Sequence, residues 1–233
     1  MEKRPLGNSN LSITPLMLGG NVFGWTADEP TSFAVLDAFV AQGGNSIDTA
    51  DAYSSWVPGH EGGESETVIG KWLKKSGKRN QVVIGTKVGL WGKRPGLKRQ
   101  NIIDACHDSL RRLGVDTIDL YWLHKDDGET PIDEFLGALD ELVKVGKVRT
   151  VGASNFKVPR FAAATLRLQY SSSIVPSSCS TRAEQLSTQS PQLQYKMPLI
   201  SVISARWMCP QTTDCTACFS ASWATARSKL LTY

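Results

Sequence analysis

The chain has 233 residues and a formal net charge of +4. No apolar run approaches the ~18 residues of a membrane span, and the first residues lead into no signal-peptide core, so we expect a soluble, cytoplasmic protein without membrane partners. The positive surplus lies in residues 156–233, which hold 8 Lys and Arg against 2 Asp and Glu, whereas residues 1–155 hold 18 against 20. This is not a basic patch interleaved with aromatic residues, and nucleic-acid binding is not expected.

The first predicted elements are short. Residues 4–14 carry a Gly-Asn-Ser-Asn turn between two leucines, which predicts a hairpin that would cap the bottom of a barrel. Residues 16–20 follow as the first core strand, ended by glycines that free the backbone to turn. Thr31 is predicted to cap a helix, which the Gly-Gly pair at 43–44 stops before a strand at 46–47.

Helix and strand signals then alternate at regular spacing, over residues 64–77 (helix), 81–88 (strand), 100–114 (helix), 118–123 (strand), 130–146 (helix), 148–153 (strand) and 158–168 (helix). The helix near residue 130 has a predicted cap at Thr130 and a proline in its first turn. Five strands that alternate with helices indicate βαβ units and a parallel sheet.

Two architectures fit this alternation, an open doubly wound sheet and a (β/α)₈ barrel. No Gly-x-Gly-x-x-Gly follows the first strand, which counts against a doubly wound dinucleotide-binding domain. Polar residues also fall at the carboxyl ends of successive strands, and a barrel brings these ends around one mouth. We therefore predict an α/β fold, a (β/α)₈ barrel of the TIM type that is incomplete or irregular after the fifth strand-helix unit.

Four of these residues could form an acid catalyst. Tyr53 follows Asp48 by five positions where a strand gives way to a loop, and Lys87 and His124 end later strands. A tyrosine with a pKa near ~10 gives up its proton reluctantly at neutral pH. A buried ammonium beside the phenol would lower that pKa, and a carboxylate would keep the ammonium charged. Lys87 and Asp48 are candidates for these two roles.

The same residues lie in motifs that resemble the aldo-keto reductase family. The motifs are Asp-Thr-Ala-x-x-Tyr from Asp48, Gly-Thr-Lys-Val-Gly around Lys87 and Tyr-Trp-Leu-His ending at His124. The resemblance implies that Tyr53, Lys87, Asp48 and His124 are catalytic. Tyr53 would protonate the oxygen of a small-molecule aldehyde or ketone, and His124 would orient the carbonyl group.

The resemblance also implies a cofactor, NADPH, bound across the barrel mouth. Residues 152–156 read Gly-Ala-Ser-Asn-Phe and are similar to the family motif in which Ser and Asn bind the nicotinamide carboxamide. The resemblance implies that Ser154 and Asn155 bind the nicotinamide carboxamide and that Asp48 belongs to the cofactor site as well. No metal is expected.

Three tryptophans are candidates for a substrate pocket. Trp25, Trp56 and Trp91 lie in the loops after the first three predicted strands. They could line an apolar pocket at the mouth or pack against the scaffold, and position alone does not decide between the two.

The resemblance covers about residues 1–168, and the amino-acid composition changes beyond it. All 20 glycines lie at or before Gly152, although further βα units would need glycine at their turns. We interpret residues 169–233 as an aberrant segment, translated in a wrong reading frame or altered by an error in the gene. The alternative, a metal or redox site at Cys215 and Cys218 with Cys209, lacks a neighbouring histidine.

The later strands of the family should supply a glutamine, a stacking aromatic residue and basic residues for the cofactor. Gln192, Gln194 and Tyr195 have suitable chemistry but no motif, and residues 198–205 form a plausible strand without a register. A barrel without its closing strands would expose two sheet edges, which favours aggregation.

The leading functional hypothesis is an oxidoreductase that reduces aldehydes or ketones with NADPH. The alternatives are an inactive, truncated or frameshifted member of the family, and a cofactor-binding partner subunit without catalysis. An isomerase or aldolase that uses Lys87 as a Schiff base belongs to a different class, and the tyrosine-aspartate arrangement argues against it.

Overall fold

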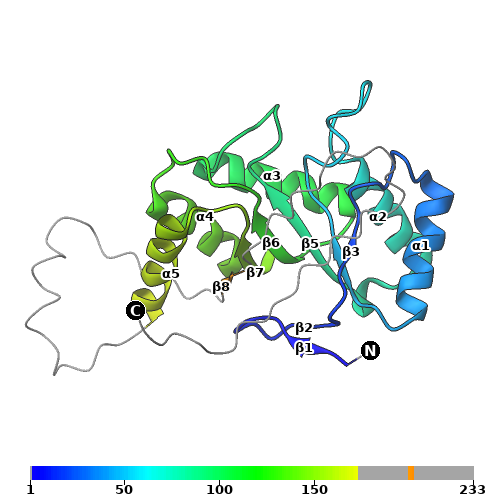
Figure 1. Ribbon diagram of the computed structural model, residues 1–233, viewed down its shortest axis with the longest axis horizontal. Coiled ribbons are helices and arrows are strands. Elements are labelled where there is room, and N and C mark those ends of the chain that lie inside the picture. The colour runs from blue at the N-terminus through cyan, green and yellow to red at the C-terminus, as the bar shows by residue number, and fades with distance from the viewer. Residues whose placement is uncertain (1, 173–198, 202–233) are drawn as a thin grey trace, which may run out of the picture.

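The structure is a computed structural model that describes residues 2–172 and 199–201. Its centre is a parallel sheet, with a small antiparallel hairpin below it (Figure 1). The hairpin strands are β1 (Arg4–Pro5) and β2 (Ser12–Ile13). The sheet strands are β3 (Leu18–Gly19), β4 (Ser46–Asp48), β5 (Val83–Val88), β6 (Ile118–Leu123), β7 (Val148–Ala153) and β8 (Leu199–Ser201).

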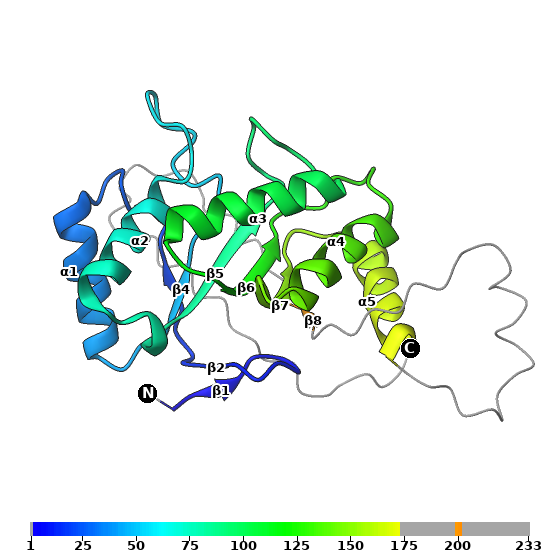
Figure 2. The ribbon, with the colours of Figure 1, turned by 180° about the vertical axis from the view of Figure 1, so that it is seen from behind.

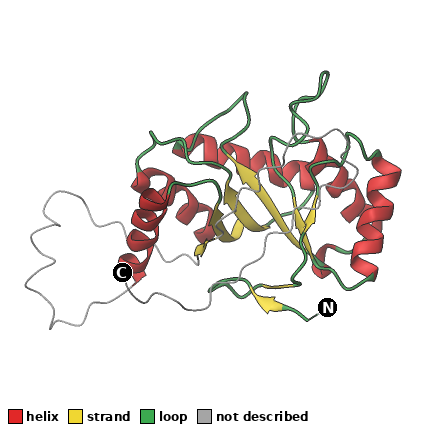
Figure 3. Cartoon of the chain, viewed as in Figure 1, coloured by secondary structure: helices red, strands yellow, loops and turns green. Residues whose placement is uncertain are grey.

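Helices follow the strands and form an arc around the outer face of the sheet (Figures 1 and 3). The five α-helices are α1 (Glu29–Ala41), α2 (Glu64–Ser76), α3 (Arg99–Leu113), α4 (Ile132–Lys144) and α5 (Val158–Ser172). A single 3₁₀ turn, η1 (Arg79–Gln81), leads into β5. The view from behind shows the hairpin of β1 and β2 at the bottom, away from the arc of helices (Figure 2).

The strand order of the sheet decides between the two predicted architectures. The strands pair in their sequence order, β3-β4-β5-β6-β7-β8, and every pair is parallel. A doubly wound sheet would reverse its order at a switch point, whereas a barrel adds each strand beside the last. The barrel-type prediction is confirmed, and within the described residues the sheet stays open, with β3 and β8 at its edges.

The core has two parts on the two faces of the sheet. The larger part lies between the strands and the helices, and its fully buried side chains include Trp72, Tyr121 and Phe135. On the other face, Leu6 and Leu11 of the hairpin pack with Trp122 and its neighbours. The hairpin therefore covers the lower end of the sheet, as the sequence predicts.

Two predicted helix caps are wrong. At α1 the cap is Asp28, whose carboxylate accepts the backbone N–H of Thr31 at 2.9 Å. At α4 the capping position is Pro131, and the hydroxyl of Thr130 donates to Asp127 at 2.5 Å. The cap of α1 lies three residues before Thr31, where the Asp28 carboxylate takes the role assigned to the threonine, and the cap of α4 lies one residue after Thr130 and makes no side-chain hydrogen bond.

One of the C-terminal predictions falls partly on described residues. Of the predicted strand at 198–205, the described residues 199–201 form β8, which pairs in parallel with β7 in the register Val151 to Leu199. The predicted roles of Gln192, Gln194 and Tyr195 and the cysteine alternative lie outside the described residues. The division of the chain at residue 168 stays a prediction, and α5 continues to Ser172.

Candidate active site

The catalytic candidates come together at the carboxyl ends of β4, β5 and β6. Beyond Asp48 the chain stays paired with β5, because the N–H of Thr49 donates to Gly85 at 2.8 Å and that of Asp51 to Lys87 at 3.3 Å. A series of turns then returns Tyr53 towards the strand end. The side chain of Lys87 reaches the same place from β5, the neighbouring strand. We call Asp48, Tyr53, Lys87 and His124 the tetrad.

Lys87 is the centre of the tetrad. Its Nζ donates to Oδ2 of Asp48 at 2.6 Å, to the hydroxyl oxygen of Tyr53 at 2.7 Å and to the carbonyl oxygen of Thr49 at 2.7 Å. The hydroxyl of Tyr53 in turn donates to Oδ2 of Asp48 at 3.0 Å. Lys87 is 7% exposed. The three acceptors match the three N–H bonds of an ammonium group, so the geometry is that of a charged lysine.

The pKa of Tyr53 differs from the sequence expectation. Burial raises the pKa of Tyr53 above its usual range, and the charge and hydrogen bond of Asp48 raise it further. The expected lowering by Lys87 is therefore wrong for this state of the chain. Burial also lowers the pKa of Lys87, although Asp48 opposes that effect. The physical reason is first the burial of the phenol and then the negative charge of Asp48, to which the phenol donates its hydrogen bond.

His124 lies beside the phenol as a neutral ring. The ring centroids of Tyr53 and His124 are 6.0 Å apart with their planes at 76°. Burial lowers the pKa of His124 to about 3, and the positive charge of Lys87 contributes. Its Nδ1 is buried and has no hydrogen-bond partner among the described residues. At neutral pH the ring therefore keeps one N–H and one acceptor nitrogen.

Ser154 and Asn155 follow β7 at the same end of the sheet. The backbone N–H of Ser154 donates to Leu123 at 2.9 Å, which continues the pairing with β6. Asn155 has a positive φ of 55°, and its Nδ2 donates to the carbonyl oxygen of His124 at 2.9 Å and to the Ser154 hydroxyl at 3.1 Å. A hydroxyl and an amide side by side next to His124 are a donor set that fits the carboxamide of a nicotinamide ring.

The three tryptophans separate into two groups. Trp25 and Trp56 are 43% and 53% exposed and meet edge to face at 5.8 Å between ring centroids. Trp56 also lies 6.2 Å from the ring of Tyr53. Trp91 instead donates its indole N–H to Glu61 at 3.0 Å and stacks with the guanidinium of Arg112. The structure thus places Trp56 next to the phenol, with Trp25 packed against Trp56.

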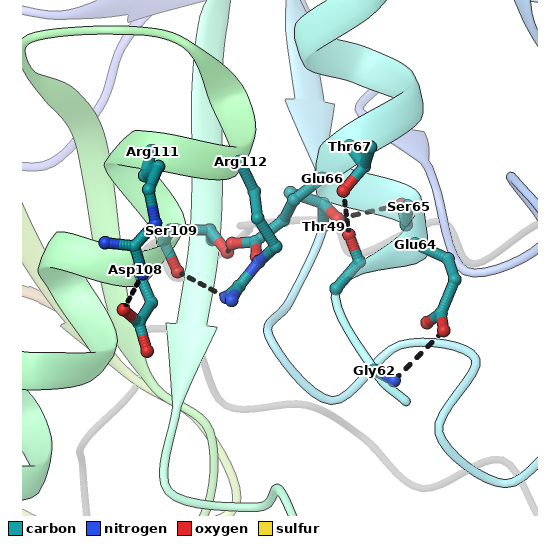
Figure 4. A network of polar contacts seen from close by, with 12 residues as sticks. Thr49, Gly62, Glu64, Ser65, Glu66, Thr67, Asp108, Ser109, Arg111 and Arg112 are labelled. Carbon is teal, nitrogen blue, oxygen red and sulfur yellow. Dashed lines mark hydrogen bonds and ion pairs between the residues drawn. The ribbon is translucent and has the colours of Figure 1, made fainter. Parts of the chain in front are cut away.

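Figure 4 shows a network of polar contacts that includes Thr49, Glu66 and Arg112, and this network has no counterpart in the sequence predictions. Glu66 of α2 is fully buried and binds Nε of Arg112 from α3 at 2.6 Å and the hydroxyl of Thr86 from β5 at 2.5 Å. Directly after β4, Thr49 donates to Ser65 of α2 at 2.8 Å. We call Thr49, Asp51, Ser65, Glu66, Thr86 and Arg112 the outer polar layer. The only sequence signal for it is the polar character of alternate residues at the strand ends.

A cleft of about 970 Å³ opens elsewhere, and it is not the active site. It is lined by residues of α2 and of the chain between α3 and β6, and by Arg79, Arg149 and Asp119 near the amino ends of β5, β6 and β7. None of the tetrad lines it. Two of its arginines are already paired with Asp119, at 2.8 Å each.

The strand order defines an α/β protein of the barrel type, with the tetrad at the carboxyl ends of its strands. The model of the aldo/keto reductase family matches residues 15–189, which reaches beyond residue 168. The chain therefore belongs to the aldo/keto reductase family. No helix in the described part of the chain is long and apolar enough to cross a membrane.

Similar proteins agree with this assignment. Aldo-keto reductase YhdN of Bacillus subtilis is 38% identical over 154 residues, with 64% of this chain and 44% of that protein covered. An aryl-alcohol dehydrogenase [NADP(+)] of Phanerodontia chrysosporium is 35% identical, with coverage of 62% and 41%. The solved structure of aldo-keto reductase AKR11C1 from Bacillus halodurans, in its holo form, is 36% identical at a TM-score of 0.61, with coverage of 70% and 53%. The chain spans about half the length of these relatives.

Proposed function

We propose that this site reduces the carbonyl group of an aldehyde or ketone to an alcohol, with NADPH as the hydride source. The observation that carries the proposal is the contact of the Lys87 ammonium with both Tyr53 and Asp48, within 2.7 Å, at the end of the sheet where barrel enzymes hold their active sites.

Tyr53 is the proton donor in this proposal. Its hydroxyl turns from Asp48 to the carbonyl oxygen of the substrate and transfers the proton as the carbonyl carbon is reduced. The N–H of Lys87 that already points at the phenol oxygen stabilises the phenolate that remains. The phenol is protonated at neutral pH before the reaction, as a general acid must be, and its raised pKa makes the stabilisation of the phenolate by Lys87 during the transfer necessary.

His124 positions the carbonyl group. Because its pKa of about 3 leaves the imidazole neutral, it can donate one hydrogen bond to the carbonyl oxygen without adding a positive charge next to Lys87. Trp25 and Trp56 form the apolar side of the substrate site next to Tyr53, and Trp91, which faces Arg112, supports the loop.

Ser154 and Asn155 would hold the carboxamide of the cofactor, and Asp48 would belong to the same cofactor site. When bound, the nicotinamide supplies hydride to the carbonyl carbon. Support for the phosphorylated cofactor comes from the similar aryl-alcohol dehydrogenase, whose name specifies NADP(+).

A Schiff-base reaction at Lys87 is the second class of function, and the geometry disfavours it. A lysine that attacks a carbonyl carbon must be neutral and have a free lone pair. Lys87 instead donates to three oxygen acceptors, which leaves no direction open for a nucleophilic lone pair.

The test is the oxidation of NADPH by the chain in the presence of a generic aldehyde, followed by absorbance. We expect turnover in the wild type and a loss of at least ~100-fold in Tyr53→Phe, because the substitution removes only the transferable proton. Tyr121→Phe is the matched control, since its buried hydroxyl donates to Ile102 on the outer face and lies outside the tetrad. Near-normal reduction by Tyr53→Phe would refute the proposal.

A further inference from the structure

Asp51 is a buried carboxyl group that the proposed chemistry does not use. It is 1% exposed, and neither of its carboxyl oxygens has a hydrogen-bond partner among the described residues. A buried carboxylate without partners is costly, so such a group is retained as a neutral acid unless a nearby cation compensates it. The position therefore requires an explanation.

The backbone places Asp51 directly behind the catalytic lysine. Its N–H donates to the carbonyl oxygen of Lys87 itself, at 3.3 Å. Side chains alternate between the two faces of an extended chain, so Thr49 and Asp51 share one face, opposite to Asp48. Thr49 contacts Ser65 of α2, which identifies this face as the outer one. Asp51 thus belongs to the outer polar layer, whereas the Lys87 amine lies on the inner face.

The charges around Asp51 come from three neighbouring elements. Glu66 on α2 faces it with a negative charge, and Arg112 on α3 and Arg94 on the loop after β5 face it with positive charges. Glu66 and Arg112 already neutralise each other through their 2.6 Å contact. When Asp51 ionises, its carboxylate has no ion-pair partner of its own among the described residues, because Arg112 is paired with Glu66.

The charged groups that act on Lys87 include two residues of the outer polar layer. Asp48 is the principal group that favours its ammonium form, and Asp51 and Glu66 follow from the outer face. Tyr53 and His124 are the titratable groups on the inner face. Glu66 is hydrogen-bonded by Arg112 and Thr86, whereas the carboxyl oxygens of Asp51 have no hydrogen-bond partner among the described residues. Burial and then Glu66 raise the pKa of Asp51 to about 7, so its ionisation falls near neutral pH.

We propose that Asp51 is a positioning residue that acts through Lys87: its carboxylate, once ionised, stabilises the Lys87 ammonium from the opposite face of the sheet. The consequence for catalysis rests on the proposed function, because it gives Lys87 its role beside Tyr53. The electrostatic coupling itself does not depend on turnover.

The test uses the full chain labelled with ¹⁵N-lysine and follows the Nζ resonance of Lys87 by NMR as a function of pH, with Lys87→Met to assign the signal. In the wild type we expect an inflection near pH 7 as Asp51 ionises. In Asp51→Asn, a neutral side chain of the same shape, we expect no such inflection and a midpoint of Lys87 deprotonation lower by at least about half a pH unit. Asp116→Asn removes an exposed carboxylate and should leave the curve unchanged.

A Lys87 resonance without an inflection near pH 7 in the wild type overturns the inference, as does an equal midpoint in Asp51→Asn. Because the wild-type titration needs no variant, a missing inflection overturns the inference even if Asp51→Asn does not fold. A chain that shows the coupling but oxidises no NADPH contradicts the proposed function alone. A chain that turns over without the coupling contradicts this inference alone.

Discussion

Lys87 links two faces of the sheet at the scale of single residues. On the inner face its amine holds Asp48 and Tyr53, and its own carbonyl oxygen accepts the N–H of Asp51, which belongs to the outer layer. The identities of the tetrad residues and the strand ends that carry them are readable from the sequence. The direction of the Tyr53 pKa is not, because it depends on burial and on contact with the negative charge of Asp48, which only the three-dimensional packing sets.

Asp51 should make stability depend on pH. An unfolded aspartate loses its proton near its ordinary pKa of 3.8, whereas burial raises the folded pKa of Asp51 to about 7. The stabilising contribution of the proton is therefore fully present below pH 3.8 and is lost as the pH rises through 7. By pH 8 the loss is on the order of 4 kcal/mol at most.

Asp51→Asn lacks this titration, so we expect it to be more stable than the wild type at pH 8 and to approach the wild type at pH 4 to 5. Urea unfolding at both pH values measures the difference, and Asp116→Asn should keep the wild-type pH dependence. Parallel pH profiles for the wild type and Asp51→Asn would show that the carboxyl group ionises alike in the folded and unfolded chain.

At the scale of elements, hydrophobic periodicity predicts the helices and strands well. The positions of threonines near the helix starts do not predict the helix caps. The apolar face of α2, with Val68, Ile69 and Trp72, is buried as its spacing indicates. Asp28 caps α1 by accepting the N–H of Thr31, and α4 has Pro131 at its capping position without a side-chain cap, because Thr130 lies in the turn that Asp127 holds. The polar layer between sheet and helices also escaped prediction, since periodicity identifies apolar faces and does not pair buried charges.

The contact between α2 and α3 depends on Gly70. A Cβ atom at this position would overlap the backbone carbonyl oxygen of Arg112 and crowd Leu113. The two helices must therefore move apart in Gly70→Ala, and we expect a loss of about 1 to 3 kcal/mol in the free energy of unfolding. Because Arg112 holds Glu66, the displacement should also disturb the outer polar layer.

The measurement is urea unfolding followed by circular dichroism. Gly92→Ala is the matched control, since nothing lies within 4 Å of a Cβ atom there and its φ is not in the left-handed region. The control should be neutral or slightly stabilising. Equal unfolding midpoints for Gly70→Ala and the wild type would show that the helices do not need this close approach.

At the scale of the whole molecule, the described residues supply six neighbouring parallel strands that carry the tetrad, and the family match extends over residues 15–189. Sequence alone predicts the singly wound order, because the polar residues at successive strand ends make sense only around one mouth. It does not give the register of β8 against β7, since a three-residue strand without a flanking motif offers too few contacts to fix one. The proposed cofactor contacts of Ser154 and Asn155 depend on this sheet, which pairs β6 with β7.

Transfer of label from the cofactor tests the central claim most directly. The chain is incubated with an aldehyde and NADPH that is dideuterated at C4 of the nicotinamide, and the alcohol is analysed by mass spectrometry. We expect one deuterium on the carbinol carbon with the wild type, and at least ~100-fold less labelled alcohol with Tyr53→Phe. Labelled alcohol in equal amounts from both proteins, or none from the wild type, would contradict a carbonyl reduction in which Tyr53 is the acid.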